Sequence, residues 1–370
     1  MKKVIKIILK IIGITSLSII GVLMIGLIIV AINSPGRLDP LKDREGNEIT
    51  GSLVEKNWTE IGGIQQGFFI RAENLNNPVL LFLHGGPGSP QLPMLIPNEL
   101  HERLERYFIV CYWDQRGAGM SFSRSIDPAS MTIEQMIEDT RQIAEYLKQR
   151  FNQERIFLMG HSWGSLLGIK TVEKYPEKFW AYIGIGQVTN QIESERLAYN
   201  FMLQHAIEIN DRRAIRALQR FDKNAPEFPC IDYTMGVRTR LMNKYGVGFT
   251  RENMSMFDAA VGMLLFRGYT LSEKLNYIQG MMFSQIHLWN SVVLEKNLFE
   301  TSTSFQVPIY VIHGRYDYQV SYTLARQWFD KIEAPDKEFF SFENSAHSPI
   351  IEEQERFVQV VREIASRAGF

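Results

Sequence analysis

Runs of consecutive apolar residues recur along the chain between polar segments. The clearest are Val79–Leu83, Tyr107–Trp113, Arg155–Met159 and Val307–Ile312. Apolar runs without alternation are typical of strands that are buried on both faces, as in parallel sheets. Segments with helical spacing lie between these runs. Strands that alternate with helices in this way predict a doubly wound α/β fold with a mostly parallel sheet.

The best-defined helical pattern runs from Thr132 to Gln149. Thr132 and Gln135 have the spacing of a capping box, in which each residue satisfies a backbone N–H of the first turn. The apolar residues that follow fall on one face of a helix, namely Ile133, Met136, Ile137, Ile143, Ala144 and Leu147. We therefore expect this helix to pack against the sheet.

The strand and helix alternation stops between about Val188 and Thr303. This part is helical in pattern, irregular and rich in methionine, and its clearest helical segments are Leu197–Gln219 and Met254–Phe266. We interpret it as an insertion that covers the sheet as a cap. Its methionine and aromatic residues are expected to form the core of the cap, because methionine commonly fills irregular gaps.

The N-terminal segment Ile11–Ile32 contains 22 residues and no charged side chain. At about 1.5 Å per residue such a helix reaches roughly 33 Å, which is enough to cross a bilayer core. Its exit, Ala31-Ile32-Asn33, is a poor cleavage site, so an uncleaved anchor is favoured over a signal peptide. A buried core helix is disfavoured because the segment has no polar face. Lysines before the segment favour an inside N-terminus and an extracytoplasmic body.

These patterns predict six segments in chain order. They are a basic tail (1–10), a transmembrane helix (11–32), a polar linker (33–50), the first part of the α/β core (51–187), the helical cap (188–303) and the second part of the core (304–370). Because the linker is short, the body is expected to lie close to the membrane surface, so membrane lipid is an expected partner.

Composition and charge exclude several classes of protein. The 40 Lys and Arg residues balance 41 Asp and Glu residues, and the net charge of −1 is not that of a nucleic-acid-binding protein. Cys111 and Cys230 are the 2 cysteines of the chain, so a disulfide scaffold is excluded. The sequence has no Cys/His cluster, which disfavours a zinc site, and no signal for a nucleotide or flavin. We expect no metal and no cofactor.

A candidate nucleophile lies in Gly160-His161-Ser162-Trp163-Gly164, which fits the pattern G-x-S-x-G. In this motif the serine occupies a tight, strained turn from strand to helix, and the glycines leave room for that turn. The motif follows the apolar run that ends at Met159, and it precedes a helical segment over Ser165–Tyr175. This context supports Ser162 as the nucleophile.

A serine nucleophile needs a base and an acid, expected in the order Ser, Asp, His. Asp317 follows the strand that ends near Ile312, and His347 follows the next predicted strand, Glu338–Phe342. Loops at the carboxyl ends of parallel strands meet at one edge of a sheet. We therefore predict a catalytic triad of Ser162, Asp317 and His347. His161 is interpreted as structural.

The tetrahedral intermediate also needs an oxyanion hole. One donor is expected to be the backbone N–H of Trp163, the residue after the nucleophile. The second is expected from the glycine-rich loop after the strand that ends at Leu83, with Gly86 as first choice and Gly85 as second. Glycines let backbone N–H groups approach a substrate closely, and one such donor contributes about 2.7–4 kcal/mol to lowering the barrier.

Together these segments resemble a known family. The sequences HGGPGSP (84–90), DQRGAGMS (114–121) and GHSWGS (160–165), with the Asp317 and His347 loops, are similar to those of proline iminopeptidases. These are S33 serine peptidases of the α/β-hydrolase fold. The resemblance covers roughly residues 60–187 and 305–370 and implies release of an N-terminal residue, typically proline, from peptides. Family members bind the substrate amine with cap glutamates, and the candidates here are Glu193, Glu195, Glu252 and Glu273.

Two departures and two alternatives accompany this resemblance. Typical family members lack an anchor such as 11–32, and the cap glutamates cannot be matched residue by residue. An esterase or amidase acting on a small apolar acyl substrate is the second enzyme hypothesis, which a methionine-rich cap would suit. Serine at position 162 argues against enzymes of this fold that use an aspartate nucleophile. The intact triad argues against a silent binding module.

Overall fold

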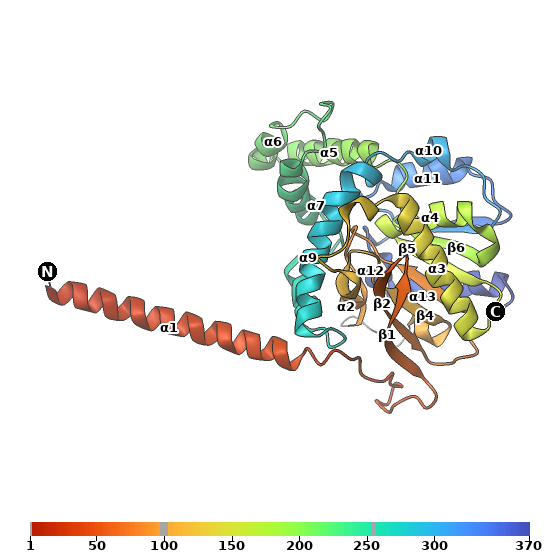
Figure 1. The fold of residues 1–370 in the computed structure, drawn as a ribbon. Coiled ribbons are helices and arrows are strands. Elements are labelled where there is room, and N and C mark those ends of the chain that lie inside the picture. The colour runs from red at the N-terminus through yellow and green to blue at the C-terminus, as the bar shows by residue number, and fades with distance from the viewer. Residues whose placement is uncertain (1, 97–102, 253–255) are drawn as a thin grey trace.

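The computed structural model describes residues 2–96, 103–252 and 256–370, and its sheet has eight strands in the order β1-β2-β4-β3-β5-β6-β7-β8 (Figure 1). The edge strand β1 pairs antiparallel with β2, β2 pairs antiparallel with β4, and the remaining pairs are parallel. The predicted mostly parallel sheet is therefore confirmed. The strands are β1 (Leu53–Ile61), β2 (Ile64–Ala72), β3 (Val79–Leu83), β4 (Ile109–Trp113), β5 (Ile156–His161), β6 (Phe179–Ile185), β7 (Ile309–Gly314) and β8 (Lys337–Phe342).

Helices cover both faces of the sheet. One core cluster joins one face to α3, α4 and α11, and a second joins the other face to α13. The core helices are α2 (Leu92–Leu95), α3 (Ile133–Phe151), α4 (Trp163–Lys174), α11 (Tyr322–Lys331), α12 (Pro349–Glu352) and α13 (Gln354–Arg367). Short helical turns complete the core, namely η2 (Leu104–Arg106), η3 (Gly119–Ser121), η4 (Pro128–Ser130) and η5 (Pro176–Lys178).

Strand register brings the motif loops together. Leu83, the last residue of β3, pairs with Trp113 of β4 on one side and with Gly160 of β5 on the other. The segments that begin at His84, Asp114 and Ser162 therefore leave the sheet at the same edge. Every residue of β3, β4, β5 and β7 is buried, which explains why these strands read as unbroken apolar runs.

The segment between β6 and β7 is helical in its described residues. Its first part has an apolar core of its own, built around Tyr199, Met202 and Tyr233. The helices are α5 (Gln191–Glu208), α6 (Arg212–Leu218), η6 (Tyr233–Arg238), α7 (Thr239–Tyr245), α8 (Met256–Leu265), α9 (Leu271–Leu288), η7 (Trp289–Val293) and α10 (Leu298–Thr301). In Figure 1, α5, α6 and α7 form the top of the molecule and α9 descends along its side.

Several details differ from the sequence interpretation. The expected helix over 197–219 is split, because Asn210 has a φ of 56° and Asp211 caps the start of α6. The Thr132 side chain accepts the Gln135 N–H, but the Gln135 side chain donates to Asp139, so this is not a reciprocal capping box. The start of the expected helix 254–266 lies outside the described residues. The hairpin of β1 and β2 and the strand β6 were not predicted.

The N-terminal helix α1 (Lys2–Ile32) projects away from the body (Figure 1). Its stretch Leu9–Ile32 has 24 residues and is long and apolar enough to cross a membrane, and none of its most apolar window is buried. The chain that follows α1 is hydrogen-bonded to the body. Pro35 forms a bridge with Thr270, and the Arg37 N–H donates to the Arg267 carbonyl over 3.1 Å.

Candidate active site

Ser162 occupies the turn between β5 and α4, with φ of 56° and ψ of −122°. A positive φ is strained for a residue with a side chain. The turn is held by the Ser162 N–H, which donates to the Ile185 carbonyl over 2.9 Å. A Cβ atom on Gly160 would lie 2.1 Å from the Gly164 carbonyl oxygen, and one on Gly164 would lie 2.1 Å from that of Leu83. Only glycine fits at both positions.

The structure brings the expected acid and base into contact. Asp317 Oδ2 lies 2.7 Å from His347 Nδ1, and Asp317 Oδ1 accepts the Val320 N–H over 2.8 Å. Burial alone would raise the pKa of Asp317, but His347 and His313, whose Nε2 is 3.1 Å from the same carboxylate, outweigh burial and hold the pKa below its usual range. Asp317 is therefore ionised and can orient the imidazole.

The backbone of His347 is in contact with two other segments of the chain. Its N–H donates to the Gly248 carbonyl of the α7–α8 loop over 3.2 Å, and its carbonyl lies 2.8 Å from His161 Nε2. The ring packs against Gly186, where an added Cβ would come within 2.9 Å of two ring atoms. Among the described residues, the buried Nε2 has no hydrogen-bond partner, so the Ser162 hydroxyl does not bond to it in this structure. Such a contact is often formed only when substrate is bound.

His161 supports this arrangement and does not titrate near neutrality. Burial, aided by His347, lowers the pKa of His161 to about 3. The neutral ring bonds to the His347 carbonyl through Nε2 and to the Gln91 side chain through Nδ1. This placement agrees with the structural role expected for His161.

The glycine-rich loop, the DQRG segment and the serine turn are joined by hydrogen bonds. The Gln115 N–H donates to His84 Nε2 over 3.1 Å, and the Gln115 side-chain amide donates to the His84 carbonyl over 3.0 Å. Gln115 Oε1 in turn accepts the Trp163 indole N–H over 2.9 Å. Burial lowers the pKa of His84 to about 4, which keeps its Nε2 free to accept. Gly85 lies against Ser162, since an added Cβ on Gly85 would be 3.1 Å from the Ser162 Cβ.

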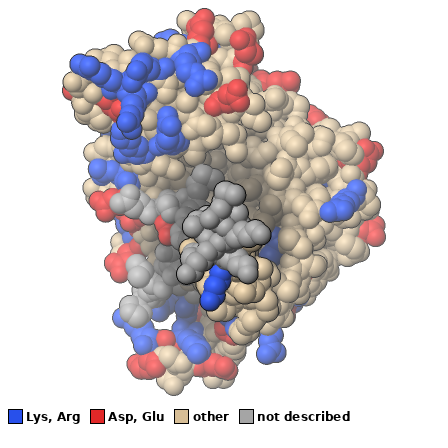
Figure 2. All heavy atoms as spheres, turned by 90° about the vertical axis from the view of Figure 1, so that its left-hand side faces the viewer, with Lys and Arg blue, Asp and Glu red and all other residues tan. Residues whose placement is uncertain are grey.

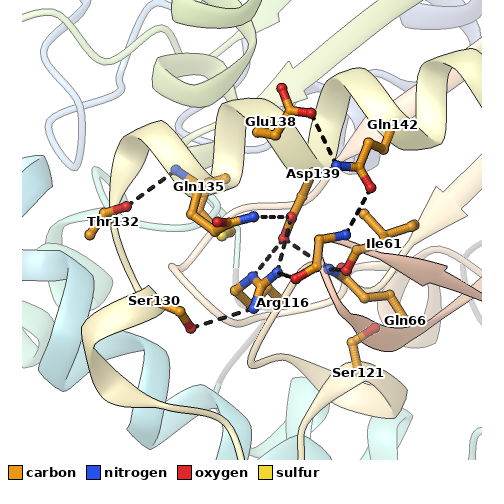
Figure 3. Close-up of polar contacts among 12 residues, drawn as sticks. Ile61, Gln66, Arg116, Ser121, Ser130, Thr132, Gln135, Glu138, Asp139 and Gln142 are labelled. Atoms are coloured by element: carbon orange, nitrogen blue, oxygen red, sulfur yellow. Dashed lines mark hydrogen bonds and ion pairs between the residues drawn. The ribbon is translucent and has the colours of Figure 1, made fainter.

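Arg116 fixes the DQRG segment to α3 through a buried ion pair with Asp139 (Figure 3). The guanidinium donates from Nε over 2.7 Å to one carboxylate oxygen and from Nη2 over 3.1 Å to the other. The carboxylate also accepts from Gln66 and Gln135, and Arg116 Nη2 reaches the Gly62 carbonyl over 2.7 Å. Both charges are thus almost fully hydrogen-bonded.

Asp114, the first residue of the segment, ties it to the cap. Its Oδ2 accepts the Met120 N–H over 2.8 Å and the Tyr269 hydroxyl over 2.7 Å. Burial raises the pKa of Asp114 to about 7, against the effect of these two bonds.

Glu352 links the cap to the His347 loop and was missed by the sequence interpretation. Its carboxylate accepts the Arg251 N–H over 2.5 Å and the Ala346 N–H over 2.9 Å. Burial raises the pKa of Glu352 to about 7, and the charge of Asp317 adds to the shift. A glutamate in a short helix after the His347 loop belongs to no motif, so no signal in the sequence pointed to it.

The four cap glutamates have different surroundings. Glu193 is half-buried and pairs with Arg196, and Glu273 pairs with Lys56 over 2.6 Å at the start of α9. Glu195 is fully buried, where it contacts Arg238 over 2.6 Å and also accepts from Gln191. Glu252 is exposed and lies four residues after Gly248, in the loop that contacts the His347 backbone. Within the described residues, no group of three or more His, Cys, Asp or Glu could hold a metal ion.

Comparison with known proteins places the chain in a family. A model of the alpha/beta hydrolase fold matches residues 78–354. The chain is also 34% identical over 313 residues to "Probable aminopeptidase YbaC" of Bacillus subtilis (strain 168), covering 81% of this chain and 93% of that relative. The chain therefore belongs to the α/β-hydrolase fold family.

Within that family the chain is similar to proline iminopeptidases. It is 24% identical to the proline iminopeptidase of Clostridioides difficile (strain 630), covering 77% of this chain and 88% of that protein. The crystal structure of proline iminopeptidase from Mycobacterium smegmatis superposes with a TM-score of 0.61 at 17% identity, over 85% of this chain and 98% of that one, which shows a shared fold. The resemblance stated from the motifs is confirmed.

Proposed function

We propose that the chain is a membrane-anchored serine hydrolase that releases an N-terminal residue, proline or a similar one, from peptides. The observation that carries the proposal is the 2.7 Å contact of Asp317 with His347, whose second ring nitrogen is buried and unpartnered among the described residues, at the sheet edge that bears the Ser162 turn. The relatives named as aminopeptidases support the substrate class.

In the proposed mechanism the Asp317 carboxylate accepts from Nδ1 of His347, which leaves Nε2 as the base. Ser162 Oγ attacks the carbonyl carbon of the scissile bond and its proton passes to His347 Nε2. The same proton then goes to the leaving amine as the C–N bond breaks. Water, deprotonated by His347, cleaves the acyl-enzyme and regenerates Ser162.

The oxyanion of each tetrahedral intermediate would be bound by the Trp163 N–H and by the N–H of Gly86, with Gly85 as the second choice. Support comes from the position of this loop against Ser162 and from its hydrogen bonds to Gln115. Preorganised donors of this kind do not need to reorient as charge develops, which is the source of their effect.

An aminopeptidase must also bind a free ammonium group, which needs an anionic partner when it is buried. Among the cap glutamates, we propose Glu252 as the first to test, because its loop contacts the His347 backbone through Gly248. Glu195 is the second, although Arg238 already neutralises it. Glu193 and Glu273 have their own basic partners, which makes them weaker candidates.

The anchor is part of the proposal. The length and apolar composition of Leu9–Ile32 support insertion in a membrane, with the N-terminus inside and the body outside. The full chain should resist extraction from membranes by alkaline carbonate. Mature protein that begins near residue 34 in the medium would instead identify a cleaved signal sequence.

The nucleophile is tested with a fluorophosphonate probe. The wild-type chain and an exposed control, Ser366→Ala, should be labelled, and Ser162→Ala should not be. Labelling of Ser162→Ala at the wild-type rate would overturn the assignment.

Substrate class is tested with prolyl arylamide and its N-acetylated form. The proposal expects hydrolysis of the free amine and none of the acetylated compound, and Glu252→Gln should raise KM where Glu193→Gln does not. Equal rates on both compounds, with rates that grow with acyl length, would favour the alternative esterase or amidase and leave the triad standing.

A further inference from the structure

Helix α9 exposes a stripe of apolar side chains to solvent. We call the following residues the α9 stripe: Leu271, Leu275, Ile278, Met282 and Ile286, each between 42% and 70% exposed. Their spacing of three or four residues places them on one face of the helix. Single exposed apolar residues are ordinary, but a continuous row along four turns of helix is typical of a surface that is covered by another apolar medium.

The rest of α9, its opposite face and one edge of the stripe, packs on the candidate active site. Ser284 Oγ donates to the Gly117 carbonyl over 3.0 Å, in the DQRG segment. Gln285 reaches the Pro87 carbonyl over 3.3 Å, and the Tyr277 hydroxyl reaches that of Pro90 over 3.3 Å. Because this face is fixed to the glycine-rich loop, α9 cannot rotate to bury its stripe within the body.

The chain leaves α1 next to the start of α9. Lys274 of α9 donates to the Asn33 carbonyl over 2.7 Å, and Pro35 forms a bridge with Thr270, the N-cap of α9. In Figure 1, α9 stands on the side of the body from which α1 projects and runs across the direction of α1. If α1 crosses a bilayer, α9 therefore lies along the bilayer surface.

Positive charge gathers on the same face. Figure 2 views the molecule from this side, and Lys and Arg side chains gather over its upper left part; in Figure 1, α6 and α7 lie in the upper part of the same side. The exposed basic residues of this part of the cap are Arg212, Arg213, Arg216, Arg220, Arg240 and Lys244. Basic residues beside an apolar helical face are the pattern of surfaces that lie in the headgroup region of anionic membranes.

We infer that the α9 stripe docks into the bilayer in which α1 is anchored, with these basic residues of the cap at the headgroups. The inference rests on the proposed membrane anchor and goes beyond it: the anchor tethers the body, whereas the stripe orients it. One helix then separates the glycine-rich loop from the lipid, a distance of about 10 Å. The active site faces the membrane surface and takes its substrate from there.

The experiment uses the full chain, with Cys230→Ser, in vesicles of phosphatidylcholine and phosphatidylglycerol. An environment-sensitive fluorophore is attached in turn at Leu275→Cys, Met282→Cys and Ser366→Cys, the last an exposed position in α13. Spin-labelled lipid is the quencher. We expect a blue-shifted emission and at least twofold quenching at positions 275 and 282, and less than 10% quenching at 366.

A matched pair of variants tests the stripe itself. Ile278→Asp together with Ile286→Asp should abolish lipid quenching at position 282, since charged side chains are costly in the apolar region. Leu75→Asp, at an exposed leucine that lies outside the cap, should leave quenching unchanged. Lipid quenching that is absent at 275 and 282 while the chain resists carbonate would overturn the docking and leave the anchor. Loss of the chain on carbonate treatment would remove the anchor first. Blue-shifted emission without lipid quenching would identify a second copy of the chain as the occupant.

Discussion

Removing Arg116 tests whether the buried ion pair with Asp139 supports both the fold and the active site. The side chains of both residues are almost inaccessible, with 3% and 0% exposed. Arg116→Met keeps the volume and removes the charge. It leaves the Asp139 carboxylate with donors from Gln66 and Gln135 alone, and it leaves the Gly62 carbonyl without the guanidinium donor.

The magnitude follows from the charge that is left behind. Breaking a buried pair by removing one partner costs about 3–5 kcal/mol. A carboxylate that has lost its partner can instead be protonated, which at pH 7 costs about 4 kcal/mol for a typical aspartate, at roughly 1.4 kcal/mol for each pH unit above the pKa. This cost is an upper limit on the destabilisation that the unpaired carboxylate itself can cause. We expect the free energy of unfolding to fall by about 3–5 kcal/mol at pH 7, and by less as the pH is lowered.

The assay is urea unfolding of the detergent-solubilised chain, followed by the fluorescence of its 6 tryptophans. Arg326→Ala is the control, because its ion pair with Asp330 is about half exposed at both partners, 46% and 55%, and such pairs contribute little. In folded Arg116→Met, kcat should also fall, since Gln115 next to it holds the glycine-rich loop. A loss below about 1 kcal/mol, equal to that of the control, would refute the argument that this pair stabilises the fold.

Three further predictions concern the histidine loop and the cap. Gly186→Ala should lower kcat by about tenfold or more, because the added Cβ would lie 2.9 Å from His347 Nδ1. The control is Gly63→Ala, which also has a positive φ but no atom within 4 Å of its Cβ, and which should affect stability alone. Equal kcat values for the two variants would contradict this. Glu352→Ala should destabilise the fold by about 1–3 kcal/mol and lower kcat more than it raises KM, because the N–H of Arg251 in the cap and the N–H of Ala346, next to His347, lose their acceptor. Steady-state kinetics and unfolding curves measure the two effects. The pKa of Asp114 is raised to about 7, so the native state holds a proton that the unfolded chain releases between about pH 4 and 7. Stability should fall as the pH rises through that range, and Asp114→Asn should flatten the slope, which an unchanged slope would disprove.

Much of the core could be predicted because its strands are buried on both faces. Val79–Leu83 was predicted to the residue, and the bounds of β5 and β7 differ from the predicted ones by one or two residues. The hairpin of β1 and β2 was not predicted, because its polar and apolar residues alternate irregularly and it contains buried polar residues such as Gln66. The cap helix predicted over 197–219 is too long, because Asn210 adopts a left-handed conformation that breaks the helix and the helical spacing of apolar residues does not reveal it.

Motifs pointed to the candidate site residues but not to the residues that support them. The positions of Asp317 and His347 after successive strands predicted that the two side chains meet, and their contact at 2.7 Å is the basis of the proposed triad. Gln115 and Glu352 act on the site by contacts between segments far apart in the chain. Such contacts depend on register and side-chain direction, which sequence periodicity does not carry. For the same reason the sequence could not show which cap glutamate, if any, faces the substrate.

The hydrogen bonds also explain why the glycine-rich loop and the DQRG segment occur together in one chain. Gln115 bonds to His84 and to Trp163, so the segment sets the position of both proposed oxyanion donors. The same segment and the same loop carry α9 through Gly117 and Pro87. A force on α9 is therefore transmitted to the glycine-rich loop through direct contacts. If α9 lies on lipid, the membrane bears on the geometry of the candidate active site, and an enzyme assayed in detergent and in vesicles should differ in kcat even with a soluble substrate.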